Sequence, residues 1–199
     1  MTAAERREQL IEIARTVFAE RGVKGTSVEE IAARAKVSKP VVYEHFGGKE
    51  GLYAVIVDRE VQKLLGMMRS ALTGGHPRAL LQQAAFALLD YIESSSEGFR
   101  ILVRDSPIGS PTGTYVSIIG DIASRVEDIL GAEFKSRGFQ AKYAPMYAQM
   151  LVGMVGGTGQ WWLEARKPEK DVVAAHLVNL AWNGLSSLDS KPELLSRET

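Results

Sequence analysis

The chain has 199 residues, in which 24 Lys and Arg balance 24 Asp and Glu, and 45% of the residues are apolar. These values belong to a globular chain that can bury a core, so they exclude a fibrous or wholly disordered protein. The absence of cysteine excludes disulfides, thiolate metal sites and cysteine nucleophiles. Charged residues from Glu5 to Glu12 interrupt the apolar run that a secretory signal needs, so we expect a cytoplasmic protein.

The first fifty residues predict three short helices. The first has an apolar face at helical spacing, formed by Leu10, Ile11, Ala14, Val17 and Phe18. Gly22 ends this helix, and Ser27 can cap a second one, with the Glu30 side chain returning a hydrogen bond to the cap. Ser38 can cap a third helix, which ends at Gly47.

The remaining residues predict longer helices. One begins at Lys49, and another carries an apolar face over residues 80–92. Residues 106–120 are rich in Ser, Pro, Gly and Thr and predict a loop that merges into a helix. Two nearly uncharged helices, at about residues 143–165 and 171–187, end the chain.

The charge-free stretch at residues 143–163 reaches the length of a membrane span. It contains Pro145, Gln149, Gln160 and four glycines, which make it a poor inserting segment, so we expect no membrane partner. The pattern as a whole predicts an all-α fold. An N-terminal three-helix domain would occupy residues 1–48, and a larger C-terminal helical bundle would occupy residues 49–199.

Two short helices joined by a brief turn match a helix-turn-helix, in which the second helix enters the DNA major groove. Residues 22–53, GVKGTSVEEIAARAKVSKPVVYEHFGGKEGLY, closely resemble the DNA-binding domain of the TetR family of transcriptional regulators. The shared features are a glycine before Thr26-Ser27, Ile31-Ala32-Ala33, Val37-Ser38, Tyr43-x-His45-Phe46 and Lys49-Glu50. Gly48 departs from the capping Ser, Asn or Asp that is frequent in the family. Beyond the first fifty residues the chain matches only in length and helical character.

The resemblance implies that Lys39, Pro40, Val41 and Val42 face the major groove, where apolar groups suit thymine methyls. The other predicted contacts are made with phosphates. Residues 1–50 hold nine Lys and Arg against eight Asp and Glu, so the charge around the third helix matters more than the total. The full predicted DNA-binding set is Thr26, Ser27, Lys36, Ser38, Lys39, Pro40, Val41, Val42, Tyr43, His45 and Lys49.

The two final helices carry small and flexible residues at helical spacing, which predicts a homodimer interface. Long uncharged helices need burial on several faces, and one small bundle offers few. The predicted interface comprises Met146, Met150, Gly153, Met154, Gly157, His176, Leu177, Leu180, Ala181 and Gly184.

The resemblance also implies a small-molecule pocket in the larger domain, for an apolar or amphipathic effector. Its predicted lining comprises Phe86, Leu89, Phe99, Arg104, Tyr115, Trp161, Trp162, Asn179, Trp182 and Asn183. The alternative for each aromatic residue is a plain core position. Arg104 lies in an apolar run, so its burial would require a partner, either elsewhere in the chain or on the effector.

These features predict a homodimeric repressor, released from a palindromic operator by its effector, with no catalytic residue, metal or cofactor. No two histidines have the spacing of a helical metal site. Two alternatives remain. One is a ligand-independent DNA binder that responds to a protein partner, and the other is a helical small-molecule-binding protein or enzyme with a degenerate DNA domain.

Overall fold

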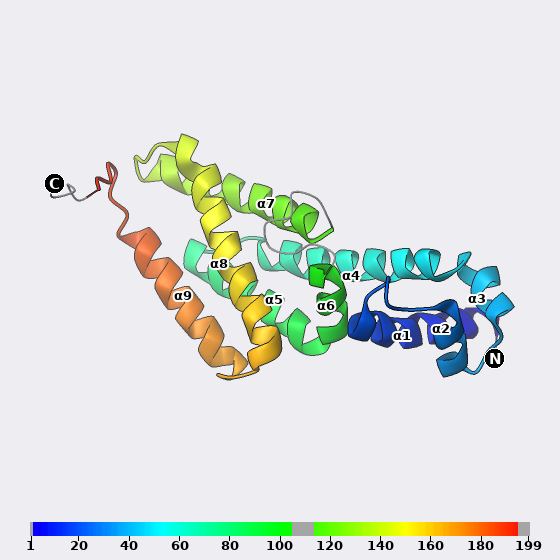
Figure 1. Ribbon diagram of the computed structural model, residues 1–199. Helices are drawn as coiled ribbons and strands as arrows, with labels where there is room; N and C mark the ends of the chain where they lie inside the picture. Colours follow the sequence, from blue (N-terminus) through cyan, green and yellow to red (C-terminus); the bar gives the residue numbers. More distant parts are fainter. Residues whose placement is uncertain (1, 105–113, 195–199) are drawn as a thin grey trace, which may run out of the picture. The chain divides into compact units, whose positions relative to one another are not determined.

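The computed structural model describes residues 2–104 and 114–194 (Figure 1). The described residues are helical and contain no strand, which confirms the all-α prediction. The elements are α1 (Ala3–Arg21), α2 (Val28–Ala35), α3 (Lys39–Phe46), α4 (Lys49–Ala71), α5 (Pro77–Ser94), α6 (Ser96–Arg104), α7 (Thr114–Ser136), the 3-10 turn η1 (Ala141–Tyr143), α8 (Ala144–Ala165) and α9 (Lys170–Ser186).

The chain divides into two compact units. The first comprises Met1–Gly66 and Tyr91–Ile118, and the second comprises Met67–Asp90 and Ile119–Thr199. Helices α4, α5 and α7 therefore begin in one unit and end in the other. This division by contacts differs from the functional boundary predicted at residue 48, which stays a prediction.

The core of the first unit is built from the predicted apolar faces. Every residue of the predicted α1 face is buried, and the buried face of α2 consists of Val28, Ile31, Ala32 and Ala35. Val42 of α3, Leu52 and Ile56 of α4, and Ile101 of α6 complete the same cluster. Helix α6 thus contributes to the core of the helix-turn-helix, although the sequence pattern did not separate it from α5.

The caps of the short helices follow the sequence in part. The Ser27 hydroxyl accepts a hydrogen bond from the Glu30 amide at 3.2 Å, as predicted. The Glu30 carboxylate does not return the bond; it pairs with Arg21 and Arg34, each at 3.2 Å. Ser38 occupies the N-cap of α3, but its hydroxyl makes no capping hydrogen bond within the described residues.

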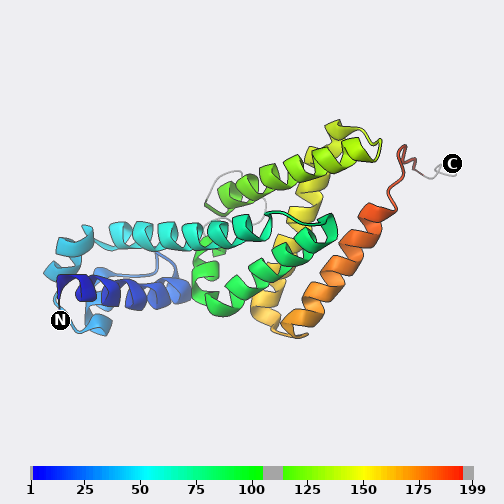
Figure 2. The same ribbon diagram turned by 180° about the vertical axis from the view of Figure 1, so that it is seen from behind.

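The second unit contains α8 and α9, which meet at the turn between them in both views (Figures 1 and 2). Their bounds agree with the two final helices predicted from the sequence. Residues 106–113 of the predicted loop lie outside the described residues, and α7 begins at Thr114. No helix in the described ranges has both the length and the apolar character to cross a bilayer.

Candidate nucleic-acid interface

The turn between α2 and α3 sets the geometry of the helix-turn-helix. Lys36 has a left-handed φ of 55°, which ends α2 and reverses the chain. The amides of Lys36 and Val37 return to Ala33 and Ala32 at 3.1 and 2.9 Å. Helix α3 therefore starts three residues later on the surface, where Ser38, Lys39 and Pro40 are exposed.

Tyr43 lies one turn into α3 and is 54% exposed, so its ring is free to meet a partner. A Cβ atom on Gly48 would lie 3.3 Å from the Tyr43 ring. The φ of Gly48 is +124°, a conformation that other residues rarely adopt. The backbone conformation at position 48 and its closeness to Tyr43 therefore favour glycine there, in place of the Ser, Asn or Asp that is frequent in the family.

Two predicted contact residues are buried, and the structure corrects them. Val42 is 0% exposed and packs in the core, because it lies on the face of α3 that meets α1 and α2. Thr26 is 3% exposed, and its hydroxyl donates to the Gly22 carbonyl at 2.8 Å. The exposed Ser27, next in the chain, remains as the candidate at the start of α2.

The predicted lysines differ in their environments. The Lys49 ammonium donates to the carbonyls of Val23 and Thr26 at 3.0 and 2.8 Å, so it holds the turn before α2 instead of facing outward. Lys39 pairs with Glu29 at 2.5 Å, and this hydrogen bond lowers the pKa of the Glu29 carboxyl below its ordinary value. Lys36 is exposed beside the turn.

Arg7 of α1 lies outside the predicted DNA-binding set. Its guanidinium donates to the His45 carbonyl at 2.7 Å, and it lies 4.4 Å from the centre of the Phe46 ring. A cation at a helix C-terminus is favourable, so Arg7 fixes the last turn of α3 to α1. His45 itself is half-buried. The contact spans 38 residues of sequence, which no local pattern could reveal.

The predicted dimer residues are mostly exposed. We use the term open face for Met146, Met150, Gly153, Gly157 and Trp161 of α8 with Val172, His176, Leu180 and Gly184 of α9, which are all exposed. A Cβ added at any of the three glycines meets no atom within 4 Å. Leu177 and Ala181 are corrections, because both are buried in the core, and Met154 is half-buried.

The predicted pocket residues belong to both units of the chain. Phe99 and Arg104 belong to the first unit, whereas the Trp and Asn residues belong to the second. The Trp162 indole donates to the Pro168 carbonyl at 2.9 Å, and Leu89 and Phe99 are buried core residues.

The other described members of the predicted pocket differ in exposure and contacts. Asn183 donates to Asn179 at 2.9 Å on the exposed side of α9. The Trp182 ring lies 5.3 Å from that of His76, and Trp161 is exposed. Phe86 is half-buried, and the side chain of Tyr115 lies outside the described residues.

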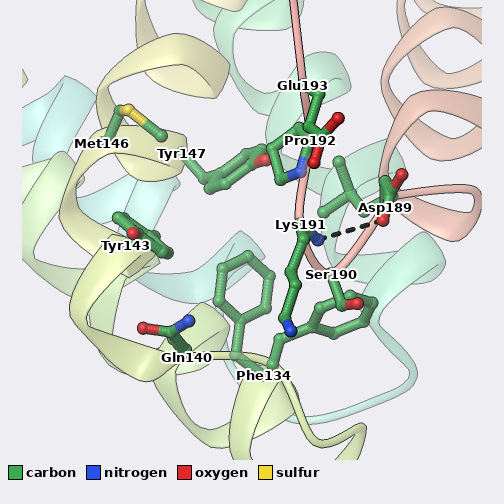
Figure 3. A pocket seen from close by; sticks show the side chains of 12 residues that line it. Phe134, Gln140, Tyr143, Met146, Tyr147, Asp189, Ser190, Lys191, Pro192 and Glu193 are labelled. Atoms are coloured by element: carbon green, nitrogen blue, oxygen red, sulfur yellow. Dashed lines mark hydrogen bonds between the residues drawn. The ribbon is translucent and has the colours of Figure 1, made fainter.

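A cavity of about 440 Å³ lies in the second unit (Figure 3). It is lined by aromatic residues of α7, η1 and α8 and by the segment after α9: Phe134, Phe139, Gln140, Tyr143, Met146, Tyr147, Leu188, Asp189, Ser190, Lys191, Pro192 and Glu193. Aromatic rings beside Lys and Asp side chains can accommodate an amphipathic molecule. No sequence pattern predicts this cavity, because its wall combines residues more than forty positions apart.

Both halves of the chain match known families. Residues 10–56 match the model described as bacterial regulatory proteins, tetR family, and residues 67–195 match the tetracyclin repressor-like C-terminal domain. A solved TetR-like transcriptional regulator from Rhodococcus sp. RHA1 is 26% identical, with a TM-score of 0.73, covering 94% of this chain and 100% of that one.

The curated relatives include both transcriptional activators and transcriptional repressors. The transcriptional activator FasR of Mycolicibacterium smegmatis is 35% identical over 92% of this chain and 84% of its own length. The transcriptional repressor BepR of Brucella suis is 28% identical, over 83% of this chain and 84% of its own. The transcriptional repressor KstR2 of Rhodococcus jostii is 26% identical, over 92% of both chains.

Proposed function

The chain belongs to the TetR family of DNA-binding transcriptional regulators, and from this premise we propose that it binds a palindromic operator as a homodimer and leaves it when a small molecule binds. The observation that carries the proposal is the exposed start of α3 on a packed helix-turn-helix. In this motif the N-terminal residues of the second helix read the bases, and the two half-sites are about 34–36 Å apart, or a multiple of that distance.

We assign operator contact to the predicted residues that the fold leaves accessible. Lys39, Pro40 and Val41 would meet the major groove, since the start of α3 is exposed and Val41 is half-buried. Phosphate contact would come from Ser27, Lys36, Ser38, Tyr43 and His45. Residues 1–48 would thus carry operator binding, and residues 49–199 would carry dimerisation and effector binding.

The open face supports the homodimer. Exposed Met, Trp, Val and Leu side chains and exposed glycines occur together along two helices, so a second copy could approach closely and remove apolar surface from water. A symmetric dimer uses the same surface patch on both subunits, which suits a single face of this kind. A dimer also matches the two-fold symmetry of a palindrome.

The effector remains the apolar or amphipathic molecule predicted from the sequence. The aromatic cavity bounded by Phe134 and Tyr147 offers a volume within the usual range for small ligands. We propose that the protein represses transcription, because BepR and KstR2 are named repressors. FasR is named an activator, so a promoter–reporter assay is the test that distinguishes repression from activation. Operator binding would take place in the cytoplasm.

The first test is selection of genomic fragments by the purified protein at moderate salt, read by sequencing. We expect a shared palindromic motif. Loss of binding on addition of a metabolite supports effector release, whereas specific binding that no metabolite alters favours a protein partner as the signal. Absence of specific binding overturns the proposal and favours a ligand-binding protein with a degenerate DNA domain.

A substitution then tests the assigned surface. Tyr43→Ala removes an exposed ring from α3 and should weaken operator binding about tenfold without dissociating the dimer. Phe46→Ala is unsuitable as a control because this ring packs against the core. Lys24→Ala is suitable, since it changes an exposed residue before α2 that is outside the predicted set. Full affinity in the Tyr43 variant would contradict its role.

A further inference from the structure

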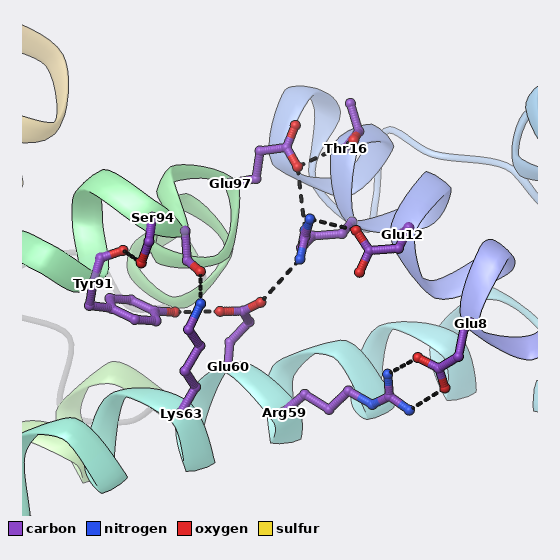
Figure 4. Close-up of polar contacts among 11 residues, drawn as sticks. Glu8, Glu12, Thr16, Arg59, Glu60, Lys63, Tyr91, Ser94 and Glu97 are labelled. Atoms are coloured by element: carbon purple, nitrogen blue, oxygen red, sulfur yellow. Dashed lines mark hydrogen bonds and ion pairs between the residues drawn. The ribbon is translucent and has the colours of Figure 1, made fainter.

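A buried carboxylate lies where four helices of the first unit meet (Figure 4). Glu60 of α4 is 6% exposed, and it accepts a hydrogen bond from the hydroxyl of the fully buried Tyr91 of α5 at 2.7 Å. Arg15 of α1 lies 3.8 Å from its other oxygen. A buried charge is tolerated only when it has such partners, so these contacts fix α4, α5 and α1 together.

The start of α6 lies directly against the same carboxylate. A Cβ atom on Gly98 would overlap the Glu60 carboxylate, so only glycine fits there while Glu60 keeps its position. Glu97, the preceding residue, accepts hydrogen bonds from Arg15 at 3.4 Å and from Thr16 at 3.2 Å. We call the group of Arg15, Thr16, Glu60, Tyr91, Glu97 and Gly98 the Glu60 junction.

The other end of α6 is fixed to α1 by Arg104. Its guanidinium donates to the carbonyls of Phe18, Ala19 and Glu20 at 3.3, 3.1 and 3.3 Å. These are carbonyls in the last turn of α1, where a helix end favours a cation. Arg104 thus has partners within the chain, one of the two possibilities left open by the sequence.

We propose that Glu60 and Arg104 are positioning residues for operator binding. Arg104 fixes the end of α6 to α1, and Glu60 joins α4 to α1 and α5 directly beneath the start of α6. Helix α1 in turn holds the last turn of α3 through Arg7. The inference rests on the proposed function and adds residues that hold α3 in position for it.

The matched pair Arg104→Gln and Arg137→Gln tests the role of Arg104. Arg137 makes the same kind of contact in the second unit, donating to the Leu185 and Ser186 carbonyls at the end of α9 at 3.1 Å each. Fluorescence anisotropy with the operator found by fragment selection should show a dissociation constant about tenfold higher for Arg104→Gln. The dissociation constant should change by less than about twofold for Arg137→Gln. Wild-type affinity of Arg104→Gln, or equal losses in both variants, overturns the proposal.

A double-mutant cycle tests the Glu60 junction. Gly98→Ala should displace the carboxylate and weaken operator binding about tenfold, whereas Glu60→Ser removes the group that the new methyl would strike. We expect the double variant to bind no more weakly than Glu60→Ser alone. Additive losses would show that Gly98 and Glu60 act independently and would contradict the junction.

Hydrogen exchange of the DNA-free protein keeps the inference testable if no operator is found. Arg104→Gln should speed amide exchange in the last turn of α1 and in α3, and Arg137→Gln should not. Unchanged exchange in α3 overturns the inference whatever the DNA result. Faster exchange with no operator would instead support the coupling of α6 to α3 while the proposed function fails.

Discussion

The two units differ in their long-range polar contacts and in the apolar side chains that they expose. In the first, charged side chains reach across the fold to backbone carbonyls and buried groups, as Arg7, Lys49 and Arg104 do. In the second, large apolar side chains such as Met150 and Leu180 stand exposed. Arg137 also bonds to a helix end in the second unit, so the difference lies in the exposed apolar surface there, which association can cover.

This contrast separates two uses of helical packing. The first unit must hold an exposed polar edge rigidly, because base reading depends on the placement of a few side chains. Its long-range hydrogen bonds provide that rigidity. In the proposed dimer the second unit would recognise another copy, and small or flexible apolar residues would allow close helix contact. This interpretation would be wrong if charges introduced on the open face left the dimer intact. It would also be wrong if the long-range hydrogen bonds of the first unit could be removed without effect on operator binding.

The largest effect is expected from Leu180→Glu on the open face. Leu180 is 66% exposed, so the change should spare the monomer fold but place a charge in the interface. We expect the dimer dissociation constant to rise more than about a hundredfold, with a similar loss of operator affinity. Sedimentation velocity measures the dissociation. Leu194→Glu, at a residue 97% exposed beyond α9, is the control and should remain dimeric; a dimeric Leu180→Glu variant would contradict the interface.

The next effect concerns the shared core of the first unit. Ile101 of α6 is buried with residues of α1 and α4, so Ile101→Ala should lower the free energy of unfolding by about 3 kcal/mol. Ile101→Val, which removes a single methylene, should cost about 1 kcal/mol. Urea unfolding monitored through α3 would measure both. If α3 unfolds at the same urea concentration in all variants, α6 does not belong to this core.

A smaller effect is expected from Arg7→Gln. Loss of the charged hydrogen bond to His45 and of the contact with Phe46 should weaken operator binding about fivefold. The slope of log affinity against log salt should not change, because Arg7 supports α3 and does not meet a phosphate. Arg6→Gln is the control, since Arg6 bonds only locally to Gln9 among the described contacts. A slope reduced by about 0.9 would instead indicate a phosphate contact.

The smallest effect is a pH dependence of the exposed Lys39–Glu29 pair. Its hydrogen bond lowers the Glu29 pKa, so the pair contributes fully above the ordinary glutamate pKa and is lost as the pH falls through the lowered value. NMR titration of the Glu29 carboxyl should show the pKa rising toward its ordinary value in Lys39→Gln, because the Lys39 hydrogen bond is the largest cause of the lowered pKa. The Glu8 pKa, lowered by Arg59, should not move and serves as the control. An unmoved Glu29 pKa would show that Lys39 is not its partner.

Local patterns were enough to predict the short N-terminal helices, the two final helices and the buried faces of α1 and α2, although not the separate helix α6. The spacing from Leu10 to Phe18 gave the buried side of α1, and Ser27 caps α2 as expected. Helical periodicity is a property of neighbouring residues, so it can be recognised without knowing the fold. The exposed Met and Gly residues of α8 were found by the same periodicity.

Contacts between distant residues could not be predicted in this way. Val42 falls in the apolar run that resembles a reading edge, yet its angle on α3 turns it into the core. Arg104 was predicted to line the pocket. Its partners in the structure are backbone carbonyls, which no sequence pattern can indicate. The cavity beside Tyr147 likewise depends on how the segment after α9 returns to α7 and α8.

The discontinuity of the first unit bears on how such regulators can be recombined. Residues 1–48 carry the candidate reading helix, but part of their core is Ile101, and their supporting arginine is Arg104. A chimera that joins only those residues to a foreign sensor would leave α1 without its native neighbour. DNA-binding specificity should therefore be transferable between regulators of this fold only when α6 is transferred together with the reading helix or is chosen to fit it.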